Sequence, residues 1–426
     1  MLAADALLGV WRSGFAVAGQ CWIRGSREMG CVKFGSVKWS SGEGRPAEGG
    51  RVGSARMLGC FRPALKKVRK LETESVTGGV DLWDASAATA NPPERFPEHL
   101  IVMVNGIVGS ADDWKYGAEQ FVCKLPDKVI VHRSECNYST LTFDGVDLMG
   151  ERLAKEVLSV VNNRPGVQKI SFVAHSLGGL IARYAIGRLY EPLSSIGSPT
   201  VAGSTLAMDK HLEGRVAGLE PMNFVTFATP HLGSRGHKQL PFLCGLPFLE
   251  RSASQTAHLI AGKTGKHLFL TDNVDGKPPL LLRMVDDVED IKFRSALRSF
   301  KRRVAYANAN FDSMVGWGTS SIRRQHELPK AQLLLSDDRY PHIAFVDRGD
   351  TGNMQKKPSS DVKAQVFDLE EEMIRGLTQV PWERVDVSFK KSTQRYVAHS
   401  TIQVKSYWIN SDGADVIYHM IDNFLI

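Results

Sequence analysis

A serine set among small residues, in Ala174-His175-Ser176-Leu177-Gly178-Gly179, has the surroundings of a nucleophile. An apolar stretch over 170–173 leads into it, and a helical pattern follows at once. This strand–turn–helix order is typical of a nucleophile elbow, where a tight turn exposes the serine hydroxyl. Such a turn excludes bulk two residues to either side, and Ala174 and Gly178 meet that condition. We predict that Ser176 is a nucleophile; the alternative is an ordinary buried turn serine.

A serine hydroxyl is an effective nucleophile only when a base takes its proton and a carboxylate orients that base. In the order typical of α/β-hydrolases, the acid follows a strand after the serine and the histidine comes last. Asp312 follows the apolar stretch 303–307 and is the predicted acid, with Asp337-Asp338 as the alternative. His399 lies after the last predicted strand and before the terminal helix, where this order requires the base.

Two other histidines also follow the predicted acid. His342 directly precedes an apolar stretch and is interpreted as a strand-edge residue. His419 belongs to the predicted terminal helix over 413–425, on the side opposite its apolar residues, which predicts a surface position. His399 is therefore the predicted base.

Catalysis by a serine also needs hydrogen-bond donors for the oxyanion that develops on the substrate. The backbone N–H of Leu177, directly after the serine, is one predicted donor. The backbone N–H of Ile107 is the other, in the loop 105–110 that follows the apolar stretch 99–104. The alternative interpretation of this loop is a plain glycine turn.

Buried strands are predicted wherever short apolar stretches end in polar or glycine-containing turns, and helical patterns alternate with them. This alternation predicts an α/β protein with the α/β-hydrolase fold, a mainly parallel sheet with helices on both faces. The site should then lie at the carboxyl ends of the strands. The predicted strands are 99–104, 129–131, 170–173, 224–228, 303–307 and 385–389, and the clearest helices are 146–161, 177–190 and 413–425.

Positive charge is concentrated at the start of the chain. Residues 1–70 hold 13 Lys and Arg against 4 Asp and Glu, whereas the other 356 residues hold 40 against 42. A general nucleic-acid-binding surface is therefore not expected on the folded body. We predict a disordered basic tail or targeting segment over 1–75 and a hydrolase domain over 76–426, with a lid or cap insertion at about 231–300.

No cofactor or metal ion is expected from this sequence. Its six cysteines are scattered without CxxC pairs, which is atypical of zinc sites and disulfide frameworks. His231 and His237 lack convergent metal-ligand spacing. The sequence leaves the oligomeric state open.

With these residues assigned, the chain resembles the plant serine esterase family that has a lipase-like α/β-hydrolase domain. The resemblance implies hydrolysis of carboxylic esters, most of all of lipids, and the roles of Ser176, Asp312 and His399 as a catalytic triad. One departure is Asn105-Gly106, where many lipases have His-Gly, and it bears on the geometry of the oxyanion loop. The matching blocks are residues 99–107, 173–179, 228–233, 312–317 and 399–404.

The insertion at 231–300 is rich in apolar residues, notably at 240–249 and at Leu280-Leu281-Leu282. It is predicted to be either a lid that meets a membrane or lipid-droplet surface or an ordinary buried cap. Either version favours a long acyl chain over a small polar ester. With the resemblance, this predicts an acylglycerol or phospholipid as substrate. The alternatives are an acyltransferase or thioesterase with the same triad, or a catalytically silent lipid- or protein-binding module. We expect a cytoplasmic protein, or a plastid protein if the basic tail is a transit peptide.

Overall fold

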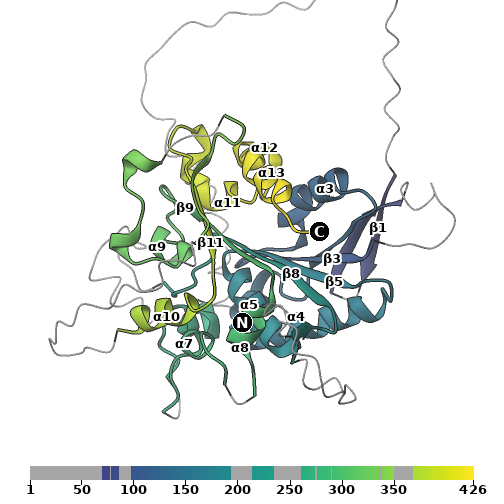
Figure 1. Ribbon diagram of the computed structural model, residues 1–426, viewed down its shortest axis with the longest axis horizontal. Helices are drawn as coiled ribbons and strands as arrows, with labels where there is room; N and C mark the ends of the chain where they lie inside the picture. Colours follow the sequence, from purple (N-terminus) through teal and green to yellow (C-terminus); the bar gives the residue numbers. More distant parts are fainter. Residues whose placement is uncertain are drawn as a thin grey trace, which may run out of the picture. The chain divides into compact units, whose positions relative to one another are not determined.

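The structure is a computed structural model. It describes residues 70–76, 78–85, 97–192, 214–234, 261–273, 276–288, 290–334, 338–349 and 368–426 (Figure 1). The predicted tail up to residue 69 and the apolar segment 240–249 lie outside the described residues, as does Asp337.

The described residues form a nine-stranded sheet with the order β1-β2-β4-β3-β5-β8-β9-β11-β10. The six strands from β4 to β11 in this order pair in parallel, and β1, β2 and β10 pair antiparallel at the two edges. The bounds are β1 Leu71–Val76, β2 Gly79–Asp84, β3 His99–Val104, β4 Val129–Ser134, β5 Lys169–His175, β8 Glu220–Phe227, β9 Arg302–Asn308, β10 Ile343–Asp347 and β11 Glu383–Val387. A separate hairpin pairs β6 Tyr190–Pro192 with β7 Gly214–Val216.

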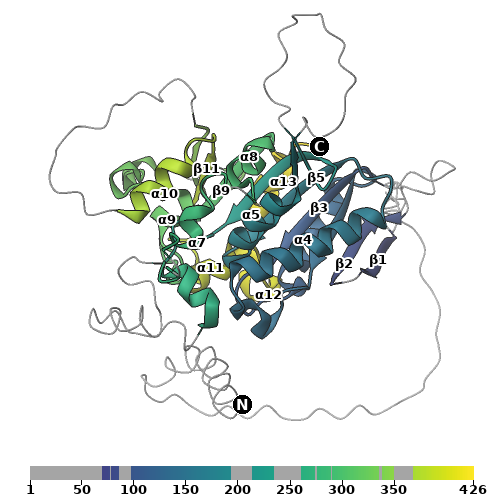
Figure 2. The ribbon, with the colours of Figure 1, turned by 90° about the horizontal axis from the view of Figure 1, so that it is seen from below.

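The central strands are rich in apolar residues because both faces of the sheet are covered. In β3 all six residues are buried. Leu100 and Val102 point into the core on one face, and Ile101 and Met103 point into the core on the other. The predicted α/β-hydrolase fold is confirmed: the sheet is mainly parallel and helices lie on both of its faces (Figures 1 and 2).

Helices α4, α5, α7, α8 and α10 pack in the core on one face, and α3, α11 and α13 pack in the core on the other. Within the described residues, no helix is long and apolar enough to cross a membrane. The α-helices are α3 Lys115–Lys124, α4 Val146–Asn162, α5 Leu177–Leu189, α7 Leu280–Arg283, α8 Phe293–Ser299, α9 Trp317–Ser321, α10 Leu369–Leu377, α11 Ala398–Thr401, α12 Tyr407–Asn410 and α13 Ala414–Asp422. The short 3₁₀ helices are η1 Ala111–Trp114, η2 Ser139–Phe143, η5 Gln325–Glu327, η6 Ala331–Leu333, η8 Thr393–Val397 and η9 Ser411–Gly413.

A buried charged cluster joins the edge strands to the sheet. His132 on β4 lies between two carboxylates, with Nδ1 2.6 Å from Asp81 Oδ1 and Nε2 2.9 Å from Glu156 Oε1. Arg164 donates from Nε to the second oxygen of Asp81 at 3.2 Å. Burial alone would lower the pKa of His132, but the hydrogen bonds and charges of the two carboxylates raise it to about 9. His132 is therefore an imidazolium that links β2, β4 and α4.

The structure bears on two sequence-based expectations. β1 begins at Leu71, so the predicted domain start at residue 76 falls inside a strand and moves back to about residue 70. Leu280, Leu281 and Leu282 are buried in the core with α10. This part of the predicted insertion therefore packs as a buried element, as in the cap alternative.

Candidate active site

The serine of the predicted elbow lies between β5 and α5. Its backbone has φ 53° and ψ −128°, a left-handed conformation that lifts the hydroxyl out of the turn. A Cβ added to Gly178 would lie 2.5 Å from the backbone oxygen of Asn105. A Cβ added to Gly179 would collide with the side chain of Thr229. The turn is thus as crowded as the small residues around Ser176 predict.

Three side chains from distant parts of the chain meet at the carboxyl ends of β5, β9 and β11. Ser176 Oγ lies 3.0 Å from His399 Nε2, and His399 Nδ1 lies 3.0 Å from Asp312 Oδ2. The serine follows β5, the aspartate follows β9, and the histidine lies on α11 after β11. The structure therefore brings together the predicted nucleophile, base and acid.

The carboxylate of Asp312 is buried and fully hydrogen-bonded. Its Oδ1 accepts the backbone N–H groups of Met314 and Val315, each at 2.9 Å. Its Oδ2 accepts the amide of Asn308 at 2.8 Å in addition to the imidazole of His399. Burial alone would raise the pKa of Asp312, but the charge of His399 and these hydrogen bonds hold it below its usual range. The group is ionised and faces the imidazole as an acceptor.

Asn308, at the end of β9, was not among the residues predicted for the site. Its position four residues before Asp312 was visible in the sequence, but an asparagine at a strand end is too common to signal a role. His175 was likewise not predicted. Its Nε2 lies 2.7 Å from the backbone oxygen of His399, and the two imidazole centroids are 4.6 Å apart.

The predicted oxyanion loop lies against the elbow. A Cβ added to Gly106 would lie 3.0 Å from Ser176 Cβ. The side-chain amide of Asn105 donates to the backbone oxygens of Gly106 at 3.1 Å and Asn137 at 3.0 Å, and it holds the loop in place. The asparagine that stands where many lipases have histidine is thus a buried structural anchor.

The two predicted oxyanion donors are the residues that directly follow Gly106 and Ser176, which lie close together. Leu177 is the first residue of α5, where backbone N–H groups have no acceptor within the helix. Ile107 follows Gly106 directly. Among the hydrogen bonds between described residues, neither of these backbone N–H groups donates. Both are therefore available to an oxygen placed beside Ser176.

The other candidate histidines lie elsewhere. His342 Nδ1 is 2.9 Å from Asp415, so it is bound to a different carboxylate. The predicted surface position of His419 is wrong: the side chain is buried, and its Nδ1 lies 2.9 Å from the hydroxyl of Tyr306. A polar partner on β9 lets this histidine be buried beside the apolar face of α13.

Two arginines on or near the sheet are buried and have structural roles. Arg303 is buried and donates to the backbone oxygen of Pro381 at 2.7 Å. Arg323 is buried and donates to both oxygens of Asp386, at 2.9 and 2.8 Å. In the part of the chain that the structure describes, no group of three or more His, Cys, Asp or Glu side chains is placed to hold a metal ion.

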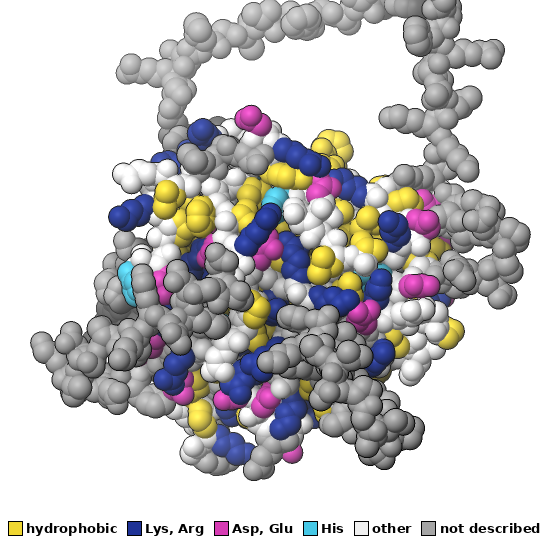
Figure 3. Space-filling view, viewed as in Figure 1, with side chains coloured by type: hydrophobic (Ala, Val, Ile, Leu, Met, Phe, Trp, Pro, Cys, Tyr) yellow, Lys and Arg dark blue, Asp and Glu magenta, His cyan; other side chains and the backbone are white. Residues whose placement is uncertain are grey.

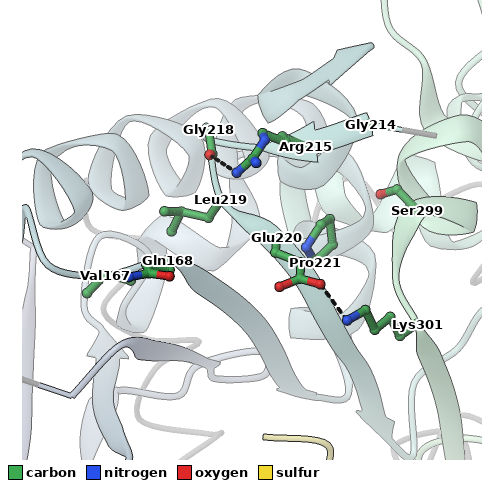
Figure 4. Close-up of a pocket in the computed structure, with 10 residues that line it drawn as sticks. All are labelled: Val167, Gln168, Gly214, Arg215, Gly218, Leu219, Glu220, Pro221, Ser299 and Lys301. Carbon is green, nitrogen blue, oxygen red and sulfur yellow. Dashed lines mark hydrogen bonds and ion pairs between the residues drawn. The ribbon is translucent and has the colours of Figure 1, made fainter. Parts of the chain in front are cut away.

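A pocket of about 380 Å³ opens at the amino-terminal ends of the parallel strands, away from the carboxyl ends where Ser176 lies (Figure 4). Its walls come from the residues before β5, the start of β8 and the residue before β9, and Glu220 pairs with Lys301 across it. Strand starts and strand ends lie at opposite edges of a parallel sheet. This pocket is therefore separate from the Ser176 site.

Comparison with known proteins identifies relatives that agree with this geometry. A family model described as "Putative serine esterase (DUF676)" matches residues 94–322. "Putative lipase ROG1" of Saccharomyces cerevisiae is 30% identical over 270 residues, which are 62% of this chain and 33% of that protein. "Putative lipase C4A8.10" of Schizosaccharomyces pombe is 29% identical over 234 residues, 53% of this chain and 26% of that protein. This chain spans about a third or less of the length of these two relatives.

Solved structures show weaker overlaps. Bacillus licheniformis lipase BlEst2 in its mature form is 16% identical, with 51% of this chain and 68% of that chain covered at a TM-score of 0.29. Pyrococcus furiosus esterase PF2001 is 12% identical, with 62% and 79% covered at a TM-score of 0.33. We assign the fold from the strand order of the sheet and not from these structural similarities.

The family match covers more than half of the chain and includes Ser176 and Asp312, whereas His399 lies beyond it. The sheet brings that histidine back to the matched region. The chain belongs to the family described as "Putative serine esterase (DUF676)", and it is by family a serine esterase of the α/β-hydrolase fold.

Proposed function

We propose that this chain hydrolyses carboxylic esters by acyl transfer through Ser176. The observation that carries the proposal is the hydrogen-bonded line from Ser176 through His399 to Asp312. A serine bound to an imidazole that is bound to a carboxylate has the arrangement of nucleophile, general base and orienting acid. Membership of the serine esterase family supports the same reaction class.

In the first half of the reaction, Ser176 Oγ attacks the ester carbonyl carbon while His399 Nε2 accepts the serine proton. The tetrahedral adduct then expels the alcohol, which takes that proton from His399, and the acyl group remains on Ser176 Oγ. In the second half, His399 deprotonates a water molecule that attacks the acyl carbonyl. The carboxylic acid leaves, and the serine regains its proton.

The surrounding groups lower the barriers of both halves. Asp312 accepts from His399 Nδ1–H, so the neutral imidazole presents an unprotonated Nε2 to the serine. The backbone N–H groups of Ile107 and Leu177 donate to the oxyanion of each tetrahedral adduct. Their position beside Ser176 is supported by the close approach of the Asn105 loop to the start of α5.

A lipid ester, either an acylglycerol or a phospholipid, is the proposed substrate class. The two fungal relatives are named lipases, which supports this choice. Exposed apolar side chains beside the site support it too: Phe311 directly precedes Asp312, and Tyr396 and Val397 lie just before His399. An acyltransferase or a thioesterase would share the triad, and each differs only in the group that accepts or carries the acyl chain.

Labelling with a fluorophosphonate probe tests the proposal, because the probe phosphonylates a serine, with loss of fluoride, only when the base and oxyanion hole of that serine are assembled. Wild-type protein should be labelled, and Ser176→Ala and His399→Ala should not be. Ser159→Ala, which changes a serine on α4, is the matched control and should be labelled like wild type. Absence of labelling in a folded wild-type protein would contradict the proposal and favour a silent binding module. Two additions to the same preparation separate the alternatives. Hydrolysis of an acyl-CoA would indicate a thioesterase, and transfer of the acyl group to an added alcohol would indicate an acyltransferase.

A further inference from the structure

Large apolar side chains gather on the surface beside His399. The most exposed are Trp408 at 94%, Tyr396 at 72% and Ile409 at 61%. Tyr407 and Val397 are exposed next to them. All five belong to η8 and α12, the elements on either side of α11 along the chain, and we call them the rim patch. Nothing in the hydrolytic mechanism uses these side chains.

The rim patch is presented by a fixed backbone. Tyr407 stacks on Tyr116 with ring centroids 5.1 Å apart, which fastens α12 to α3. The buried Asn410 donates to Thr401 Oγ1 at 3.0 Å and accepts from the backbone N–H of Ser406 at 3.1 Å, which fastens α12 to α11. A one-turn helix held at both ends keeps Trp408 and Ile409 directed outward. Figures 1 and 2 show α11 and α12 as neighbours in both views.

The segment that carries the rim patch is basic, and the first acidic residue after it, Asp412, accepts a hydrogen bond from Ser392. Residues 387–411 contain four basic side chains and no acidic one. Lys390 and Lys391 are exposed, and neither forms an ion pair with any described residue. Arg395 lies over the ring of Tyr396 at 4.7 Å and over that of Phe311 at 5.6 Å, so basic and aromatic groups interleave. Lys405 pairs with Asp113 at 3.1 Å.

Figure 3 shows hydrophobic side chains interspersed with Lys and Arg, and with some Asp and Glu, over the end of the molecule where α11 to α13 lie in Figure 1. Tryptophan and tyrosine favour the boundary between lipid headgroups and acyl chains. Lysine and arginine favour the surface of anionic lipids. Exposed apolar side chains in this number and proximity are typical of an interaction site.

We infer that the rim patch docks this protein onto an anionic lipid surface, with Trp408 and Ile409 inserted at the headgroup boundary. The inference rests on the proposed function only in what docking is for: it would bring Ser176 close to a lipid ester in the membrane. Binding to the lipid surface itself does not depend on hydrolysis. The rim patch differs from the predicted lid at 231–300, because the docking residues lie in 390–409, on both sides of the proposed base His399. Charge complementarity with Lys390 and Lys391 selects lipid over a neutral apolar partner.

Vesicle co-sedimentation of the full chain carrying Ser176→Ala tests docking without hydrolysis. The probe is a vesicle of phosphatidylcholine mixed with phosphatidylserine, compared with pure phosphatidylcholine. Adding Trp408→Ser and Ile409→Ser together should weaken binding to the mixed vesicles by at least about tenfold, because two large apolar side chains are lost from the boundary. Lys390→Gln and Lys391→Gln should each weaken it about fivefold, and only on the mixed vesicles.

The matched control is Leu158→Ser, which removes an apolar side chain of 42% exposure from the end of α4, at the opposite edge of the sheet. It should bind like the parent. No binding of the parent to either vesicle, or equal binding by the Trp408 and Ile409 variant, would overturn the inference. Self-association that this variant abolishes, measured by light scattering without vesicle binding, would assign the rim patch to a second copy and would also overturn it.

Hydrolysis assays separate this inference from the proposed function. In a chain with Ser176 intact, Trp408→Ser and Ile409→Ser should leave kcat/KM for p-nitrophenyl acetate, a water-soluble ester, within about twofold of wild type. Hydrolysis of esters in mixed vesicles should fall with the binding. Vesicle binding by a chain that hydrolyses no ester would leave docking standing and remove the proposed function. An equal loss on both substrates would place the patch in the reaction and overturn docking as its role.

Discussion

The imidazole of His175 is hydrogen-bonded to the backbone oxygen of His399, with 2.7 Å between Nε2 and that oxygen. Burial lowers the pKa of His175 well below its ordinary value, and the neighbouring His399 lowers it further. The ring is therefore neutral, and because a carbonyl only accepts, Nε2 carries the proton. The residue directly before the proposed nucleophile thus holds the backbone of the proposed base.

Replacing His175 by Phe should lower kcat for a soluble ester by about tenfold to 100-fold, because a small displacement of His399 spoils the geometry of proton transfer. The KM should change little, since His175 acts through another residue. His175→Gln, whose Nε2 can also donate, should recover much of the loss. A loss that Gln does not repair, or one that appears only in KM, would show that the contact does not position the base.

Replacing Asp312 by Asn should lower kcat by about 1,000-fold to 10,000-fold without unfolding the protein, because an amide N–H facing His399 favours the wrong tautomer. Asn308→Ala removes one of four hydrogen bonds to the same carboxylate, and we expect a loss of about tenfold or less. Steady-state kinetics with circular dichroism as the folding check would measure both. Near-normal turnover in Asp312→Asn would remove Asp312 as the orienting acid.

Stability should depend on pH through the buried His132. Its pKa of about 9 in the folded chain exceeds the ordinary value of 6.5. The stabilisation that protonated His132 gives the folded state is therefore fully present below pH 6.5 and is lost as pH rises to 9. The free energy of unfolding should therefore fall by about 3 kcal/mol over that range. Urea unfolding at several pH values measures this change.

Asp81→Asn is the matched comparison for His132. Removing one of the two carboxylate charges brings the pKa of His132 nearer to its ordinary value, so the decline in stability between pH 6.5 and 9 should become shallower. The same slope in both proteins would mean that other groups cause the pH dependence.

Replacing Gly178 by Ala should destabilise the chain by about 1–3 kcal/mol. The new Cβ would lie 2.5 Å from the backbone oxygen of Asn105 and 2.6 Å from that of Val104. Both are backbone atoms, so the clash is relieved only if the backbone itself shifts. Because the same loop carries the Ile107 amide, esterase activity should fall as well. Gly166→Ala, whose Cβ meets nothing within 4 Å, is the control and should change stability by no more than about 0.5 kcal/mol.

The parts of the fold that the sequence predicts are those with a local signal. The buried parallel strands are continuous apolar stretches, and the elbow needs small residues at fixed positions, so both could be found by eye. The order along the chain then selected Asp312 and His399, which the structure places in line with Ser176. Their catalytic roles remain predictions until the labelling experiment.

Other features depend on contacts that no local pattern contains. β1 is a polar edge strand, so LETESV gave no apolar signal. The burial of His419 depends on the hydroxyl of Tyr306, 113 residues away, and that of Arg323 depends on Asp386, 63 residues away. A helical wheel considers one helix alone, so it places His419 on the surface, and no local pattern shows the partner of Arg323.

Ser176 and His399 are 223 residues apart along the chain, and only the completed sheet brings their side chains to 3.0 Å. A nascent chain that has already formed the elbow therefore still lacks its base, and it is chemically silent while β9, β11 and the last helices are being made. The order of synthesis acts as a delay. If the proposed function is correct, the newly made chain has no esterase activity until folding has brought His399 to Ser176.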